Sequence, residues 1–243
     1  MTMDTAKKID PALYLIPVPL GENPLEQVLP SYNHQVVCAI KHFIVEDIRS
    51  ARRFLKKTDA SIDIDILTFF ELNEHTDLTK ISHILEPLEK GQPMGVISEA
   101  GCPAVADPGA AAVALAQKKN LPVVPLVGPS SIILSLMASG FNGQNFAFNG
   151  YLPVKPAERA AKIRQLESRA YKEHQTQIFI EAPYRNAKML DSLLSVCRAD
   201  TKICLAVGIT TEDEFIKTKT VAQWKKEKLP QFQKIPAIFL LYA

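Results

Sequence analysis

The chain has 243 residues, of which 47% are hydrophobic and 22% are charged, and its 28 Lys and Arg outnumber its 26 Asp and Glu by two. So much apolar side chain excludes a wholly disordered protein, while the near-neutral charge neither requires nor excludes a nucleic-acid partner. The cysteines Cys38, Cys102, Cys197 and Cys204 form no CxxC pair, so we expect free thiols in a reducing compartment and no metal site.

The length suits one large domain or two small ones. The segment MTMDTAKKIDP lacks the apolar region of a signal peptide. The apolar runs fall well short of the roughly 20 residues that a membrane helix needs. We therefore expect a cytoplasmic protein without a membrane partner.

Strands and helices alternate in the first half of the predicted structure. Apolar runs that are typical of buried strands cover residues 12–18, 42–46, 62–70, 94–98 and 121–127. Helical spacing or capping is found at 47–57, 76–91 and 108–119. This alternation predicts a mostly parallel sheet covered on both faces.

The second half has shorter and more closely spaced strands, which indicate a mixed sheet. Helices are predicted at 130–139, 155–174 and 184–197, and strands at 145–153, 176–183, 202–209, 213–221 and 236–243. The predicted fold class is therefore α/β with two α/β domains, a parallel N-terminal one and a mixed C-terminal one. We place them at residues 1–124 and 125–243.

The loop ISEAGCPAVADPG, residues 97–109, is unusually long for a strand-to-helix connection. Ligands of open α/β sheets bind beyond the carboxyl ends of strands, where this loop lies. Gly101 and Gly109 allow a ligand to approach the backbone closely, and Pro103 and Pro108 stiffen the path. The loop thus suits an adenine- and ribose-bearing ligand, although an ordinary long loop explains the same pattern. At 126–131, LVGPSS offers hydroxyls for a helix cap or for a ligand.

Other sequence motifs are absent: there is no GxGxxG, no GxxxxGK[ST] and no GxSxG. Without HExxH spacing, the histidines are interpreted as surface or packing residues. Glu46, Asp47 and Glu99 lie at predicted strand ends and are our candidates for a general base. Capping of a helix, with an ion pair to Arg49, is the alternative for Glu46 and Asp47. Cys102 is interpreted as a small buried thiol.

Five segments together resemble a known family: LYLIPVPLG, FIVEDIRSARRFL, GVISEAGCPAVADPG, VVPLVGPSS and NGYLPVKPAER. In order and spacing they resemble the tetrapyrrole-methylase superfamily of S-adenosylmethionine-dependent methyltransferases. The chain is most similar to the branch that methylates a ribose 2′-hydroxyl of small-subunit ribosomal RNA, and IFIEAPYRNAKMLDSL also resembles that branch. The resemblance implies two α/β domains with the cofactor cleft between them, and a homodimer.

The resemblance also implies which residues bind S-adenosylmethionine. These are Ser98, Glu99, Ala100, Gly101, Asp107, Pro108, Gly109, Ser130, Ser131, Ala182, Val207, Pro236 and Ala237. The chain departs from the branch where Glu99 replaces Asp, where Cys102 replaces Thr, and where VGITT replaces RELTK.

The expected function is S-adenosylmethionine-dependent methylation of a ribose 2′-hydroxyl in ribosomal RNA of the small ribosomal subunit. The alternatives are a methyltransferase for a tetrapyrrole or other small molecule, and a catalytically silent paralogue that binds the cofactor or RNA. Two basic runs are candidates for phosphate contacts, although a solvated helix face explains both equally well. They are Arg49, Arg52, Arg53, Lys56 and Lys57, and Lys155, Arg159, Lys162 and Arg164.

Overall fold

The computed structural model describes the chain except for residues 1–8, 74, 77, 229–231 and 233. The chain divides into two compact units, residues 1–129 and 130–243. The sequence-based boundary after residue 124 falls earlier, within a strand. That strand pairs as far as Pro125, and the Leu126 amide donates to the Leu15 carbonyl at 3.0 Å, so these residues stay with the first unit.

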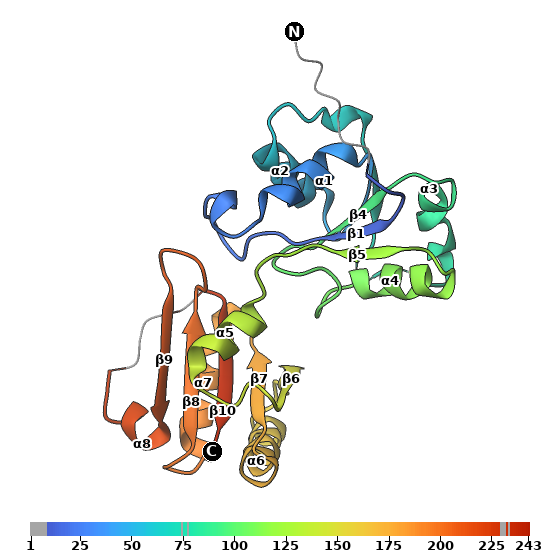
Figure 1. Cartoon of the computed structure of the whole chain (residues 1–243). Helices are drawn as coiled ribbons and strands as arrows, with labels where there is room; N and C mark the ends of the chain where they lie inside the picture. The colour runs from blue at the N-terminus through green and yellow to red at the C-terminus, as the bar shows by residue number, and fades with distance from the viewer. Residues whose placement is uncertain (1–8, 74, 77, 229–231, 233) are drawn as a thin grey trace. The chain divides into compact units, whose positions relative to one another are not determined.

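The first unit is built on a parallel sheet, as predicted, with the strand order β3-β2-β4-β1-β5. Its strands are β1 (Leu13–Ile16), β2 (His42–Val45), β3 (Thr68–Glu71), β4 (Met94–Ile97) and β5 (Val123–Pro125). Most of β1, β2 and β4 is buried, because helices cover both faces of the sheet (Figure 1).

The helices of this unit cover the two faces of the sheet, and the buried side chains of each helix show which face it covers. They are η1 (Leu25–Gln27), α1 (Ser31–Ala39), α2 (Ile48–Thr58), η2 (Ile64–Ile66), η3 (Leu78–Leu85), α3 (Glu86–Glu89) and α4 (Gly109–Lys118). Val36 of α1 and Leu55 of α2 share a core with Phe43 of β2. The next strand residue, Ile44, belongs to the core on the opposite face, with Ala112 of α4.

Three elements differ from the sequence-based expectation. Helix α1 is not predicted, because it buries little more than Asn33, Val36 and Val37 and lacks a clear apolar stripe. The expected strand at 62–70 starts only at Thr68, because the preceding residues form the 3-10 turn η2. The expected helix at 76–91 includes residue 77, which lies outside the described residues, and its described part forms the 3-10 helix η3 followed by one turn of α-helix.

The second unit contains the predicted mixed sheet, in the order β6-β7-β10-β8-β9. Strands β6 and β7 are parallel and the other pairs are antiparallel. The strands are β6 (Phe146–Tyr151), β7 (Thr176–Ile180), β8 (Lys202–Val207), β9 (Phe215–Thr220) and β10 (Ala237–Tyr242).

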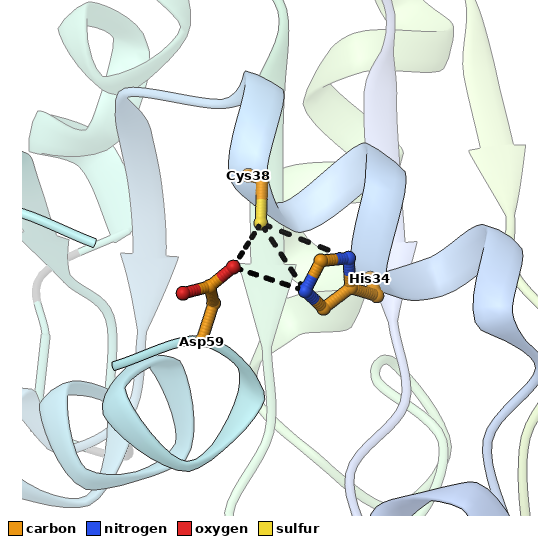
Figure 2. A group of neighbouring side chains, drawn as sticks. All are labelled: His34, Cys38 and Asp59. Atoms are coloured by element: carbon orange, nitrogen blue, oxygen red, sulfur yellow. Dashed lines mark hydrogen bonds and ion pairs between the residues drawn. The ribbon is translucent and has the colours of Figure 1, made fainter. Parts of the chain in front are cut away.

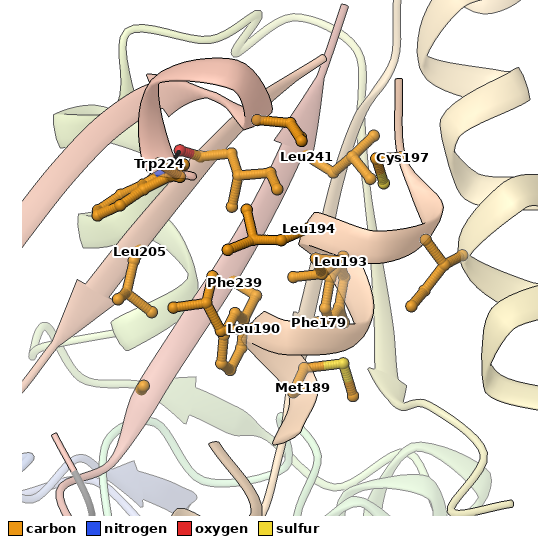
Figure 3. Close-up of a cluster of buried hydrophobic side chains, with 14 of the residues drawn as sticks. Phe179, Met189, Leu190, Leu193, Leu194, Cys197, Leu205, Trp224, Phe239 and Leu241 are labelled. Atoms are coloured by element: carbon orange, nitrogen blue, oxygen red, sulfur yellow. Dashed lines mark hydrogen bonds between the residues drawn. The ribbon is translucent and has the colours of Figure 1, made fainter. Parts of the chain in front are cut away.

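The core of this unit lies between the sheet and helix α7, as Figure 3 shows. Met189 and Leu193 of α7 pack with Phe179 of β7 and Phe239 of β10, whose rings stack with centroids 5.8 Å apart. The helices here are α5 (Ser131–Ser139), α6 (Pro156–Glu173), η4 (Pro183–Arg185), α7 (Asn186–Val196) and α8 (Val221–Trp224). Among the described residues, none of the helices of either unit is long and apolar enough to span a membrane.

Candidate functional site

The carboxyl ends of β2 and β4 form a topological switch point in the first unit. From β2 the chain leaves through α2 on one face of the sheet, and from β4 it leaves through α4 on the other. Such diverging connections open the crevice in which α/β proteins bind ligands. A pocket lies here, lined by Ile44, Val45, Glu46, Leu72, Val96, Ile97, Asp107, Pro108 and Gly109.

This pocket brings the candidate base Glu46 together with three of the predicted cofactor residues, Asp107, Pro108 and Gly109. It holds about 160 Å³ of space, part of which is open to solvent. It encloses no room even for a water molecule, so in this structure it is a shallow depression and not a preformed ligand cavity.

The start of the 98–109 loop is anchored by its own backbone and by the segment after β1. The Val18 amide donates to the Gly101 carbonyl at 3.0 Å, and the Gly101 amide donates back at 3.2 Å. Gly101 adopts a φ of +72°, which side-chain-bearing residues rarely adopt. The buried Ser98 hydroxyl donates to the Gly101 carbonyl at 3.2 Å, whereas Glu99 and Ala100 are exposed.

Asp107 holds the end of the same loop. Its Oδ1 atom accepts hydrogen bonds from the Ala104 amide at 3.2 Å and from the Gly109 amide at 2.6 Å. A Cβ atom on Gly109 would lie 2.7 Å from that oxygen and 2.9 Å from Cγ1 of Val96, so no larger residue fits without a shift. Ala104 has a φ of 65°, a strained value for alanine that these bonds help to maintain.

The loops after β1, β4 and β5 pack together at this end of the sheet. The Cys102 thiol lies 3.4 Å from the Pro129 carbonyl. Burial raises the pKa of Cys102, so it is a half-buried packing thiol and not an activated nucleophile. A Cβ atom on Gly128 would lie only 2.2 Å from the ring of Pro17. The loops therefore form one close-packed body of main chain, as the glycine and proline pattern indicates.

The three candidate bases have different surroundings. Only Glu46 lines the pocket. The Asp47 carboxylate caps α2, since its Oδ1 atom accepts from the Ser50 amide at 2.7 Å. The hydrogen bonds to Ser50 lower the pKa of Asp47, which makes it a weaker base. Glu99 is exposed on the loop and does not line the pocket.

In the second unit, four predicted cofactor residues lie at one end of the sheet. Val207, the last residue of β8, pairs with Ala237, the first of β10. The Gly208 amide donates to the Pro236 carbonyl at 2.9 Å. Ala182 lies two residues beyond β7, whose last residue Ile180 pairs with Ile238 of β10.

The predicted serines lie at the start of helix α5. The Ser130 hydroxyl caps this helix by accepting a hydrogen bond from the Ile133 amide at 3.5 Å. Ser131 is the first residue of the helix. Of the two roles that the sequence analysis offered, helix capping is therefore the one that Ser130 has in this structure. The capping hydrogen bond is long and weak, so the hydroxyl can also contact a ligand.

Sequence reasoning missed three polar residues at that same end of the second sheet. Glu181 and Asn186 are buried, and the Oε2 atom of Glu181, the Oδ1 atom of Asn186 and the Oγ1 atom of Thr210 are buried without a hydrogen-bond partner. Such orphaned atoms are rare and point to an absent ligand or water. Glu181 and Asn186 lie in the segment IFIEAPYRNAKMLDSL that resembles the family, but the sequence does not show that their side chains are buried, because that burial arises only in the folded unit.

Glu181 also forms an ion pair, in which its own side chain is buried and that of Arg185 is 23% exposed. Its Oε1 atom accepts from the Ala182 amide at 2.8 Å and from the Arg185 guanidinium at 2.6 Å. This pairing raises the pKa of Arg185. The exposed ring of Tyr184 stacks 5.1 Å from the same guanidinium. The ion pair holds the turn η4 in place. This turn starts directly after the predicted residue Ala182 and leads into α7.

Solved structures share this fold. The methyltransferase CobJ matches with a TM-score of 0.62 at 16% identity, covering 95% of this chain and 93% of that one. The cobalamin biosynthetic enzyme cobalt precorrin-4 methyltransferase CbiF matches with a TM-score of 0.58 at 14% identity, covering 96% and 95%. This likeness concerns the fold alone, and it confirms the predicted α/β architecture with one parallel and one mixed sheet.

Several proteins that are more similar to this chain in sequence than these two structures share the same name. Ribosomal RNA small subunit methyltransferase I of Vibrio cholerae is 30% identical over 215 residues, which are 88% of this chain and 70% of that protein. Its namesakes in Streptococcus pyogenes and Micromonospora olivasterospora are each 33% identical, covering 84% and 83% of this chain and 67% and 60% of their own length. No protein-family model matches the chain. These relatives confirm the resemblance of the sequence motifs: the chain belongs to the methyltransferase family named ribosomal RNA small subunit methyltransferase I.

Proposed function

We propose that this protein transfers the methyl group of S-adenosylmethionine to a ribose 2′-hydroxyl of small-subunit ribosomal RNA. Membership of the family makes it a methyltransferase. The observation that carries the rest is the pocket at the β2–β4 switch point, where Glu46 faces the same space as Asp107, Pro108 and Gly109. A candidate base and a candidate cofactor loop thus share one site.

Residues of each unit, considered separately, support binding of the cofactor. In the first, Gly101 and Gly109 keep the 98–109 loop free of bulk beside the pocket. In the second, the orphaned acceptors of Glu181 and Asn186 suit a donor such as the amino group of adenine. When bound, S-adenosylmethionine supplies a methyl group that is already activated by a sulfonium charge.

Glu46 is the proposed general base. With the methyl donor bound, Glu46 would accept the proton of the ribose hydroxyl as that oxygen is methylated. Such proton transfer contributes about 10²–10⁴-fold to a rate. Asp47 is less suited because its carboxylate caps α2 and because it does not line the pocket. Glu99 is less suited because it lies outside the pocket.

The exposed face of α2 is the proposed contact for RNA phosphates. Its basic residues recur at helical spacing and are all exposed: Arg49, Arg52, Arg53, Lys56 and Lys57. The basic run of α6 is a weaker candidate, because Arg159 is buried and its Nε atom donates to the Ser192 hydroxyl at 3.0 Å. Binding through the α2 face will weaken steeply as salt rises.

Transfer of labelled methyl groups tests the proposal. We expect incorporation into small ribosomal subunits that lack the modification, and none into fully modified subunits. Nuclease digestion then identifies the labelled ribose. Glu46→Gln is expected to lower kcat by about 10²–10⁴-fold, with Glu99→Gln as the comparison that loses much less. If the wild type binds S-adenosylmethionine in calorimetry but labels no subunit, the proposed substrate is wrong and the silent-paralogue alternative gains.

Two finer expectations remain proposals. We expect the protein to act as a homodimer, on the strength of its resemblance to the superfamily, and to work in the cytoplasm with its ribosomal substrate. Sedimentation equilibrium at micromolar concentration measures the first. Cell fractionation, with ribosomal protein as the marker, measures the second.

A further inference from the structure

Three side chains of metal-ligating type meet on the surface of the first unit, away from the residues that line the pocket. His34 and Cys38 are four residues apart on α1 and so share one face of that helix. Asp59 ends helix α2 as its C-cap residue. Figure 2 shows the imidazole, the thiol and the carboxylate turned toward one another from the two helices.

The distances between their ligand atoms are those of a metal-binding set. His34 Nε2 lies 3.1 Å from Asp59 Oδ2, and Cys38 Sγ lies 3.8 Å from each of those atoms. Bonds of about 2.0 Å to N and O and about 2.3 Å to S, at tetrahedral angles, place N and O roughly 3.3 Å apart and S roughly 3.5 Å from either. Cys38 Sγ also lies 4.0 Å from Nδ1, beside the ring and not ahead of Nε2, so side-chain rotations that move the thiol by about 1 Å relative to the ring are needed to bind zinc.

The same residue types also occur in catalytic Cys–His–Asp arrangements, but the geometry here is different. In a catalytic triad, the base orients one ring nitrogen toward the acid and the other toward the nucleophile. Here Nε2 of His34 is nearest to both Asp59 and Cys38. Burial and the nearby Asp59 carboxylate also raise the pKa of Cys38, so without a cation it is not an activated thiol.

We propose that His34, Cys38 and Asp59 form a zinc site, with solvent in the fourth position. The N, S and O donor set matches this borderline cation. Ser61 acts as the outer support, since its amide and hydroxyl donate to Oδ1 of Asp59 at 2.8 and 2.6 Å and leave Oδ2 for the metal. The His34 and Asp59 side chains are 49% and 29% exposed, so an ion enters directly from solvent.

This site departs from the expectation of no metal in the sequence analysis. That expectation rested on cysteine spacing, and the third ligand comes from the end of a different helix. Bound zinc would join the last turn of α2 to α1 and so hold the basic α2 helix in place. The proposal does not depend on the methyltransferase function, because none of its three residues lines the pocket.

Cobalt substitution tests the site in the whole protein, reduced with a phosphine and freed of metal with a chelator. Addition of Co²⁺ is expected to give one equivalent of intense visible bands and a near-ultraviolet sulfur-to-cobalt band. Addition of Zn²⁺ should abolish both and raise the thermal midpoint by several degrees. Competition with a chromophoric chelator then measures zinc affinity.

Variants identify the ligands. Cys38→Ser should lose the sulfur-to-cobalt band, and Asp59→Asn should weaken zinc binding by about 100-fold or more. Ser61→Ala should weaken it by about 10–100-fold, as for other outer-shell partners. Cys102→Ser is the matched control and should keep both the spectrum and the affinity. Circular dichroism checks that each variant is folded. A wild type with no cobalt bands, or Cys38→Ser with wild-type spectra, overturns the proposal.

Discussion

The two units hold their candidate cofactor residues in opposite ways. In the first, the polar groups of the 98–109 loop bond to one another, with Asp107 Oδ1 accepting from the Ala104 and Gly109 amides. In the second, Glu181 and Asn186 each keep a buried oxygen without a partner. The first unit therefore satisfies its own loop groups, whereas the second holds acceptors whose desolvation a water or ligand donor would compensate.

Thiol labelling gives the largest expected contrast between the units. Cys38 is exposed, whereas Cys197 is buried and the low-polarity surroundings raise its pKa to about 12. At pH 8 without zinc, we expect iodoacetamide to modify Cys38 about a thousandfold faster or more, because Cys197 reacts only after local opening. Mass spectrometry of timed digests measures both rates. Comparable rates would mean that the core of the second unit opens readily.

Removal of the buried carboxylate tests its contribution to the stability of the second unit. Glu181→Ala removes the acceptor for the Ala182 amide and the partner of the partly exposed Arg185 guanidinium, and should lower the free energy of unfolding by about 1–3 kcal/mol. Urea denaturation measures the change. Glu158→Ala is the matched control, because it breaks an exposed pair with Lys155 that is worth about 0–1 kcal/mol.

Glu181→Gln sharpens the same comparison, since it preserves an oxygen for the Ala182 amide. It should retain most of the stability but weaken S-adenosylmethionine binding, as measured by calorimetry, because an amide is a poorer acceptor than a carboxylate. Unchanged affinity would show that the orphaned oxygen does not face the cofactor.

Removal of the loop anchor tests preorganisation in the first unit. Asp107→Ala takes away the acceptor for two backbone amides and should lower the free energy of unfolding by about 1.5–3 kcal/mol. Cofactor affinity should fall along with it, because the loop must then be ordered on binding. Asp107→Asn keeps an acceptor oxygen and should have a smaller effect on both. Equal effects of the two variants would mean that charge, not loop geometry, is what matters.

The smallest expected effect comes from the helix cap at Asp47. Its folded-state pKa is lowered by the bonds to Ser50, so the stabilisation is fully present above the unfolded-state pKa and is lost as pH falls through the folded value. Wild type should therefore exceed Asp47→Ala in stability at pH 7, and the difference should begin to shrink as pH falls below about 4, the unfolded-state pKa. Urea midpoints measured from pH 7 to pH 2 follow this. A gap that does not narrow over that range contradicts an ionised cap.

Local sequence determined the elements whose residues carry a strong periodic or apolar pattern. The run LYLI is a strand because it is buried on both faces, and Asp47 starts α2 because its short carboxylate suits the first turn. The glycines and prolines of 98–109 likewise predict a loop of closely packed main chain, since those residues act through their own backbone. The family resemblance followed from the same local features.

Tertiary structure decided the features that form only when residues far apart in the sequence come together. Helix α1 forms although its own pattern is weak, because the sheet covers Val36 and Val37. Asp59 approaches His34 and Cys38 only because α1 and α2 lie on the same face of the sheet. The Asn186 side chain donates to the Ile235 carbonyl at 2.8 Å only because the start of α7 and the segment that precedes β10 come together in the second unit. Burial and pairing across the fold are properties of the packed chain, and the spacing of residues along the sequence does not contain them.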